Sequence, residues 1–286
     1  MKIIKNNIEL KNEYFIFPGG EINVKIDSSN LKYLYEKAEY QTIIAKIQSS
    51  LEVMQLVMLV DALRRFDSTP IRLFLPYVPY GRQDRVCNNG EAFSLKAFAG
   101  VINSLNFSKV IVCDPHSEVI GAVFDNVTVI SQKQIINKFQ AFIEKVIVSS
   151  SVFISPDAGS NKKTSEIAKY FNHNSFVRAD KLRDLSTGEI KETIVYATET
   201  IKGADVFIVD DICDGGRTFI ELAKVLKRKD VNTVNLYVTH GIFSKGTKVL
   251  FENGIDAIYT TNSFFEIVPS NVDSQKVNIL NIDNIF

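Results

Sequence analysis

Cysteine and histidine are scarce in this chain, and their scarcity argues against one kind of site. The 286 residues include only three cysteines and three histidines. The cysteines, Cys87, Cys113 and Cys213, do not stand at the spacing of paired metal ligands, so no zinc site is expected. An odd and sparse cysteine count predicts reduced thiols and a cytoplasmic location.

Long apolar runs and an excess of one charge are also absent. No stretch approaches the roughly 18 apolar residues of a membrane span. The first ten residues, MKIIKNNIEL, lack the apolar core of a signal peptide. The 33 basic and 33 acidic side chains cancel, so neither nucleic acid nor a membrane is an expected partner. The 45% hydrophobic and 23% charged residues are typical of a globular protein.

What the chain does have is an alternation of short apolar runs with amphipathic stretches. We expect strands at 42–47, 71–76, 109–113, 152–155, 205–209 and 233–238, and helices at 53–65, 95–105, 162–171 and 218–227. This alternation predicts an α/β fold with parallel sheets flanked by helices. Because both halves show the same order of strand, acidic turn and helix, we expect two similar domains, 1–130 and 131–275, with the tail 276–286 packing back onto the first.

The strongest single pattern is the segment VFIVDDICDGGRT, which ends at Thr218. An apolar strand is followed by Asp210 and Asp211, then by Gly215 and Gly216. Ligands of parallel sheets bind beyond the carboxyl ends of strands, and amides at a helix start bind anions. We expect the glycines to admit a phosphate, Thr218 to cap the helix, and the carboxylates to accept hydrogen bonds from sugar hydroxyls. A plain helix cap is the alternative, but two adjacent buried aspartates favour a ligand.

This segment resembles the phosphoribosyl-diphosphate-binding loop of the type I phosphoribosyltransferase fold. Six further motifs resemble those of the phosphoribosyl-pyrophosphate synthetase family, in family order and over nearly the entire chain. They are FPGGEINVKI at 17–26, VDALRR at 60–65, PYVPYGRQDR at 76–85, CDPHS at 113–117, SPDAGS at 155–160 and THGIFS at 239–244. The resemblance implies two type I phosphoribosyltransferase-like domains, the first with ATP-binding motifs and the second with the ribose-phosphate loop and a catalytic lid.

The activity implied by the resemblance is a magnesium-dependent diphosphokinase reaction. The β,γ-diphosphate of ATP would move to the anomeric hydroxyl of a 5-phosphorylated ribose, ribose 5-phosphate by default, with release of AMP. The family pattern places Mg²⁺ at His116 and Asp157, gives His116 a part in catalysis, and places Lys181 and Arg183 in the lid. Lys162 and Lys163 add positive charge near this site, although a solvated helix face explains them equally well.

Substrate contacts are also implied by the resemblance. The implied ATP contacts are Phe17, Glu21, Arg82, Gln83, Asp84 and Arg85. The first two would hold the adenine, often from a neighbouring subunit, so a homo-oligomer is expected, either a dimer or a hexamer. The implied contacts to the acceptor and the transferred diphosphate are Gly159, Ser160, Asp210, Asp211, Asp214, Gly215, Gly216, Arg217 and Thr218.

Three positions depart from the family pattern. Gly19 stands where the family has an acidic or amide residue, and Leu182 separates Lys181 from Arg183. The phosphate loop reads DGGRT, with Arg217 where the family has small residues. A guanidinium can pair with more charge than a monophosphate carries. One hypothesis is therefore that the acceptor is ADP-ribose, as in phage enzymes of NAD salvage; the other is that Arg217 faces solvent.

Two other classes of protein compete with this interpretation. A phosphoribosyltransferase would share the phosphate loop, but the ATP motifs at 17–21 and 82–85 are not expected in it. A catalytically inactive synthetase-associated subunit would keep the fold and lose lid or metal residues. This chain retains His116, Asp157 and Lys181, so an active enzyme is the favoured prediction.

Overall fold

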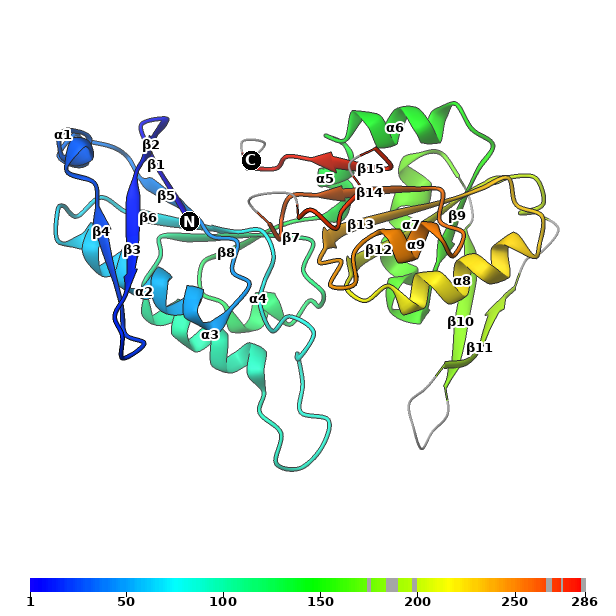
Figure 1. Cartoon of the computed structure of the whole chain (residues 1–286), viewed down its shortest axis with the longest axis horizontal. Helices are drawn as coiled ribbons and strands as arrows, with labels where there is room; N and C mark the ends of the chain where they lie inside the picture. Colours follow the sequence, from blue (N-terminus) through cyan, green and yellow to red (C-terminus); the bar gives the residue numbers. More distant parts are fainter. Residues whose placement is uncertain (174–175, 184–189, 197–199, 266–268, 274, 284–286) are drawn as a thin grey trace. The chain divides into compact units, whose positions relative to one another are not determined.

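The computed structural model describes residues 1–173, 176–183, 190–196, 200–265, 269–273 and 275–283. The chain divides into two compact units, Met1–Ile130 and Ser131–Phe286. Each unit has its own sheet (Figure 1). Each unit also has its own buried apolar residues. No helix in the described ranges is long and apolar enough to cross a membrane.

The first unit is built on a sheet in the order β2-β1-β5-β6-β7-β8. Its parallel part consists of β5 (Gln41–Ile44), β6 (Ile71–Leu75), β7 (Lys109–Cys113) and β8 (Val127–Ile130). The strands that extend it in the antiparallel sense are β1 (Lys2–Lys5) and β2 (Ile8–Leu10). A separate antiparallel hairpin consists of β3 (Asn12–Ile16) and β4 (Ile22–Ile26).

Helix α2 (Ser50–Arg64) shows how the sequence specifies the helices of this unit. It begins at a capping box, in which Ser49 and Glu52 each bind the other's backbone amide. Its buried residues recur at helical spacing and so lie on one face: Leu56, Leu59, Val60 and Leu63. The remaining α-helices described here are α1 (Leu31–Leu34), α3 (Ser94–Ser104) and α4 (Ile120–Val123).

The second unit has a sheet in the order β11-β10-β9-β12-β13-β14-β15. Its strands are β9 (Ser151–Ser155), β10 (Val177–Arg183), β11 (Ile190–Val195), β12 (Asp205–Cys213), β13 (Thr233–Gly241), β14 (Ala257–Thr261) and β15 (Val277–Leu280). All neighbours pair in parallel except β10 and β11. The central strands β12 and β13 are almost wholly buried, as expected when helices cover both faces.

Helices of the second unit also bury one face each. They are α5 (Gln132–Ile136), α6 (Gln140–Ile147), α7 (Asn161–Tyr170), α8 (Arg217–Lys227) and α9 (Lys248–Phe251). Helix α6 inserts Phe142 into an aromatic cluster, with ring centroids 5.0 Å from Tyr237 and 5.2 Å from Tyr259. Helix α8 buries Phe219 and three further residues at helical spacing. These apolar faces fix the helices against the sheet.

The predicted architecture, two α/β domains whose largely parallel sheets are flanked by helices, is confirmed. Strand β7 has the bounds expected from the sequence, and α8 begins one residue before the expected start. The tail from residue 276 differs from the prediction. Its Val277–Leu280 segment does not extend the first unit; it pairs with β14 as β15, the red strand in Figure 1, because the outer edge of β14 offers it a parallel partner.

Candidate active site

Strand β12 carries two adjacent aspartates close to its carboxyl end. The strand continues past Asp210 and Asp211 to Cys213, because it stays paired with β13 as far as Gly241. The expected strand end at Val209 was therefore too early. Asp210 is half-buried and Asp211 is only 5% exposed. Two carboxylates are thus held on a rigid strand rather than on a loop.

The Asp210 carboxylate lies in a polar cluster. It accepts a hydrogen bond from the Ser160 hydroxyl at 2.8 Å and one from the Asp211 amide at 3.0 Å. Burial raises the pKa of Asp210 to about 8, and the carboxylates of Asp211 and Asp157 act in the same direction. The Gln132 side chain donates to the Asp210 carbonyl at 2.8 Å. The cluster therefore concentrates negative charge that a cationic or hydroxyl-bearing ligand would stabilise.

The loop after β9 meets the end of β12 at this cluster. Asp157 accepts hydrogen bonds from the Ser160 amide and hydroxyl, at 3.3 Å and 3.2 Å. A Cβ atom on Gly159 would lie 3.3 Å from that carboxylate, so glycine keeps the turn compact. The Lys163 ammonium lies 3.7 Å from the Asp211 carboxylate. Lys163 therefore belongs to the site rather than to a plain solvated face.

The phosphate loop joins β12 to α8. Its Gly216 has a φ of +75°, and a Cβ atom there would come within 2.6 Å of Leu250, so this position requires glycine. Thr218 does not cap α8 as predicted: the helix begins at Arg217, and Thr218 is its second residue. In the described part of the chain no side chain caps α8, which leaves its first amides to bind an anion.

The predicted lid residues Lys181 and Arg183 lie in β10. This strand pairs with β11 in an antiparallel ladder that includes Lys181 opposite Thr193 and Arg183 opposite Ile190. The register shifts between Leu182 and Arg183, since Leu182 lies opposite Glu192 and Arg183 lies opposite Ile190. The surroundings of the two side chains, and residues 184–189, lie outside the described part of the structure. Their role remains a prediction.

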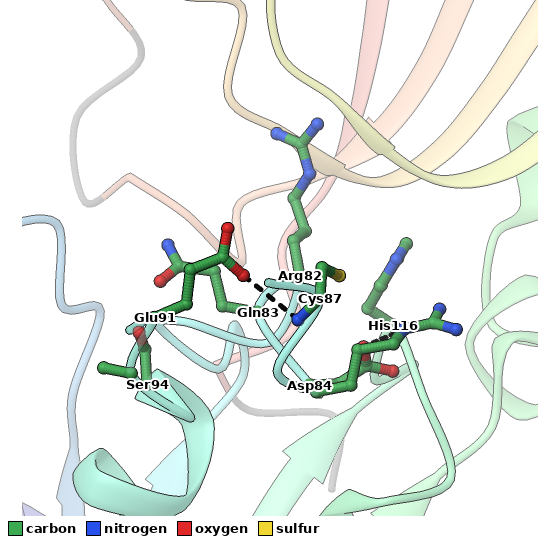
Figure 2. Close-up of a pocket in the computed structure, with 9 residues that line it drawn as sticks. Arg82, Gln83, Asp84, Cys87, Glu91, Ser94 and His116 are labelled. Atoms are coloured by element: carbon green, nitrogen blue, oxygen red, sulfur yellow. Dashed lines mark hydrogen bonds and ion pairs between the residues drawn. The ribbon is translucent and has the colours of Figure 1, made fainter. Parts of the chain in front are cut away.

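A pocket of about 560 Å³ lies in the first unit (Figure 2). Its lining includes every residue expected from the loop after β6 and the histidine after β7: Arg82, Gln83, Asp84, Arg85 and His116. The remaining lining residues carry no motif and were not predicted: Cys87, Glu91, Ala92 and Ser94. These four residues line the pocket because the chain turns at residues 87–91, just before α3 begins.

Glu91 closes that turn. Its carboxylate accepts hydrogen bonds from the amides of Cys87 and Asn88, both at 3.0 Å, and from the Asn88 side chain at 2.6 Å. Figure 2 shows Glu91 turned toward Cys87. These bonds hold the pKa of Glu91 below its usual value. Nearby, the Arg85 guanidinium lies 3.2 Å from Asp84. The pocket wall is thus an ordered polar loop.

Phe17 and Glu21 lie in the turn between β3 and β4. The Phe17 amide donates to the Glu21 carbonyl at 2.8 Å. Phe17 is 50% exposed, and its neighbours Phe15 and Ile16 are exposed as well. Neither Phe17 nor Glu21 lines the Arg82–His116 pocket of the first unit. The expected adenine contact is therefore not formed with that pocket.

The expected metal ligands belong to different units, with His116 in the first and Asp157 in the second. Within the described residues, no group of three or more histidine, cysteine, aspartate or glutamate side chains could hold a metal ion. Sharing of Mg²⁺ between His116 and Asp157 thus stays a prediction.

Two known protein families match this chain, one largely within each of its two units. Residues 7–105 match the N-terminal domain of ribose phosphate pyrophosphokinase, and residues 125–275 match the phosphoribosyl transferase domain. The first match contains the Arg82–Arg85 loop, and the second contains the aspartate pair and the phosphate loop. These residues therefore lie in recognised domains, whereas His116 lies between the two matched ranges.

Individual relatives agree with these domain matches. The chain is 28% identical over 238 residues to a ribose-phosphate pyrophosphokinase of Pasteurella multocida, which covers 82% of this chain and 73% of the relative. It is 29% identical over 251 residues to one of Aquifex aeolicus, covering 86% and 77%. The fold resembles the crystal structure of phosphoribosylpyrophosphate synthetase from Mycobacterium smegmatis, with a TM-score of 0.81 and 22% identity over 96% of this chain and 86% of that one. With both of its domains matched in order, the chain belongs to the ribose-phosphate pyrophosphokinase family.

Proposed function

We propose that the protein transfers the β,γ-diphosphate of ATP to the anomeric hydroxyl of a 5-phosphorylated ribose, ribose 5-phosphate by default, and releases AMP. The names of the relatives support this activity. The observation that carries it is the pair Asp210 and Asp211 on β12, beside the uncapped start of α8. That arrangement supplies acceptors for sugar hydroxyls and a phosphate site on the same short segment.

The acceptor would bind along the end of β12. Asp210 and Asp211 would orient the ribose hydroxyls, and the α8 amides would hold the 5-phosphate. Ser160 already donates to Asp210, and Lys163 lies close to Asp211, so both carboxylates are fixed before the sugar arrives. Gly159 would leave its amide accessible to the transferred diphosphate. Positioning of this kind is the main contribution of a protein to phosphoryl-type transfer.

ATP would bind at the Arg82–His116 pocket of the first unit. Its volume of about 560 Å³ lies within the ordinary range of small-molecule sites. Arg82 and Arg85 offer guanidinium groups that stay charged at any working pH and match phosphate oxygens. Gln83 and Asp84 add hydrogen-bonding groups to the same wall.

Mg²⁺ is the metal that the family implies, and the Asp157 carboxylate offers it an oxygen donor of the kind it prefers. Burial raises the pKa of Asp210, as do the negative charges of Asp211 and Asp157, and a divalent cation would offset those charges. Magnesium prefers oxygen donors and needs only one or two protein ligands beside substrate phosphates and water. Asp157 and His116 would hold it, and when bound it would neutralise the diphosphate.

Charge stabilisation during transfer would come from Lys181, Arg183 and Arg82. Cations placed at the transferring and departing phosphates stabilise the transition state more than the ground state. No side chain is assigned as a strong general base. The protein would instead hold the anomeric hydroxyl in line with the middle phosphorus of ATP.

Association of subunits would complete the adenine-binding site. Phe17 is half-exposed and does not line the Arg82–His116 pocket, which supports binding of adenine in a neighbouring subunit's site by Phe17 and Glu21. We therefore infer a homo-oligomer. The free thiols Cys87, Cys113 and Cys213 support a reducing compartment, the cytoplasm.

The test is AMP formation from ATP, Mg²⁺ and ribose 5-phosphate, followed by chromatography. Release of AMP that requires the sugar would support the proposal, and Lys181→Ala should abolish release while ATP binding persists. Binding of both substrates without AMP would indicate an inactive regulatory subunit. Base-dependent consumption of phosphoribosyl diphosphate without ATP would indicate a phosphoribosyltransferase.

A further inference from the structure

The loop that carries Arg82 begins at a strained residue. Tyr80 has a φ of 62°, a left-handed conformation that a bulky side chain rarely adopts because its Cβ atom meets the backbone. Such a conformation persists only where the surrounding structure enforces it. Tyr80 does not itself line the Arg82–His116 pocket. The cause of its conformation therefore lies behind the pocket wall.

The side chain of Tyr80 is anchored at two helices. Its hydroxyl lies 3.2 Å from the hydroxyl of Ser50, the first residue of α2, and the two groups form a hydrogen bond. Its ring packs against Phe98 of α3, with 5.5 Å between the ring centroids. Phe98 is only 5% exposed and belongs to the apolar core of the first unit. Tyr80 is thus fixed at its tip and along its ring.

The backbone around Tyr80 makes two overlapping turns. The Gly81 amide donates to the Val78 carbonyl at 3.2 Å, and the Gln83 amide donates to the Tyr80 carbonyl at 2.9 Å. Gly81 is buried, and a Cβ atom there would lie 3.0 Å from the Val78 carbonyl oxygen and 3.9 Å from the Cβ atom of His116. Because Tyr80 belongs to both turns, its conformation determines the direction in which the chain continues into the pocket wall.

Beyond Tyr80 the loop leaves the core. Arg82, Gln83 and Arg85 are exposed, and a hydrogen bond of 3.3 Å from the Leu95 amide to the Gln83 carbonyl connects this segment to α3. Exposed cations bind a phosphate more tightly when their backbone is already in place, because ordering a loop on binding costs conformational entropy. The anchors of Tyr80 provide that order before a nucleotide binds.

We propose that Tyr80 is a positioning residue for nucleotide binding. Its anchored side chain holds the left-handed turn that presents Arg82 and the following residues to the phosphates of ATP. Tyr80 stands in a recognised motif, but only the structure links it to Ser50 and Phe98. The inference rests on the proposed function, because that function assigns the pocket to ATP. It extends the nucleotide site to side chains that lie outside the pocket lining.

The experiment measures ATP binding by calorimetry with Mg²⁺ present, and measures ribose 5-phosphate binding and thermal unfolding in parallel. Tyr80→Phe and Ser50→Ala each remove one side of the same hydrogen bond. Each should raise Kd for ATP about two- to fivefold, and the double variant should match the single variants. Kd for ribose 5-phosphate should stay unchanged in all three proteins.

Two further variants separate the anchors from the backbone conformation. Asparagine tolerates a left-handed backbone better than tyrosine does, but Tyr80→Asn loses both anchors, so Kd for ATP should rise about tenfold. The control Tyr35→Phe removes a hydroxyl from a tyrosine of the same unit that is 67% exposed, and it should bind ATP like the wild type. If Tyr80→Asn does not fold, Tyr80→Phe and Ser50→Ala decide the question.

A purely structural role would lower the melting temperature of the Tyr80 variants and leave Kd for ATP unchanged, and that result would overturn the proposal. Equal weakening of ribose 5-phosphate binding would also overturn it, because the effect would not be specific to the nucleotide. If the wild type binds ATP but releases no AMP, the proposed reaction is wrong, and Kd for ATP in the variants still decides the role of Tyr80. A wild type that does not bind ATP would reject both.

Discussion

At Asp210 the fold opposes ionisation of a side chain that the proposed reaction would use. Burial and two neighbouring carboxylates raise the pKa of this group to about 8, while the Ser160 hydroxyl and the Asp211 amide bind it. Groups selected for ligand binding often reduce the stability of the ligand-free protein. Asp210 therefore offers a test that separates binding from folding.

Asp210→Asn should stabilise the ligand-free protein at high pH and abolish activity. Because the folded pKa lies above the unfolded value of 3.8, the contribution of Asp210 to stability is complete below about pH 4 and is lost as pH rises through about 8. The variant cannot ionise, so its melting temperature should exceed that of the wild type by roughly 2–8 °C at pH 9 and equal it near pH 4. Calorimetry without Mg²⁺ measures this. If the melting temperatures of the two proteins changed with pH in the same way, the raised pKa of Asp210 would be contradicted.

Among the elements, β13 and its loop depend on a glycine. A Cβ atom on Gly241 would lie 2.2 Å from the Phe243 ring and 2.8 Å from the Thr260 hydroxyl. Gly241→Ala should therefore destabilise the protein by about 1–3 kcal/mol through overpacking. Gly100→Ala, in the exposed interior of α3 with open space around it, should stabilise by roughly 0.5–1 kcal/mol. Denaturant titration compares both, and equal effects would refute the packing argument.

The turn at residues 87–91 gives a second prediction at this scale. Glu91→Ala removes three hydrogen bonds that order the wall of the pocket. Since the loop must then be ordered by the nucleotide, KM for ATP should rise about three- to tenfold with little change in kcat. The control Glu252→Ala removes an exposed carboxylate from the second unit and should leave KM unchanged. A fall in kcat alone would assign Glu91 a different role.

Local patterns predicted the elements best where strands are short and buried. Strand β7 agrees with its expected range, and α8 nearly so. The end of β12 was missed because Asp210 and Asp211 suggest a turn, whereas pairing with β13 keeps them in the strand. The cap at Thr218 was wrong because Gly216, in a left-handed conformation, starts α8 one residue earlier than expected.

The candidate site could be predicted only where it coincides with motifs. The residues of the loops after β6, β9 and β12 were found in the sequence. Gln132 and Glu91 were not, because Gln132 binds a backbone group distant in sequence and Glu91 reaches the pocket through the path of a turn.

For the whole molecule, the predicted shared adenine site can be tested by mixing inactive variants. Phe17→Ala and Lys181→Ala should each be inactive alone. If Phe17 serves a neighbouring subunit, mixed assemblies contain intact sites, and activity should recover to about a quarter of the wild type in a twofold arrangement. Mixing Lys181→Ala with Asp211→Asn should restore nothing, because both residues would serve the same subunit. Absence of recovery in the first mixture would place the adenine contact within one chain.

The amides of Ile242 and Phe243 donate to the Cys213 carbonyl at 2.9 Å and 3.1 Å, and these bonds have a consequence for the thermodynamics of acceptor binding. They connect the phosphate loop to the neighbouring strand before any ligand is present. A loop already in its binding conformation loses little conformational entropy when it closes on an anion. Acceptor association should therefore show a small heat-capacity change and a rate close to that of electrostatically steered encounter, with most discrimination between acceptors expressed in the dissociation rate.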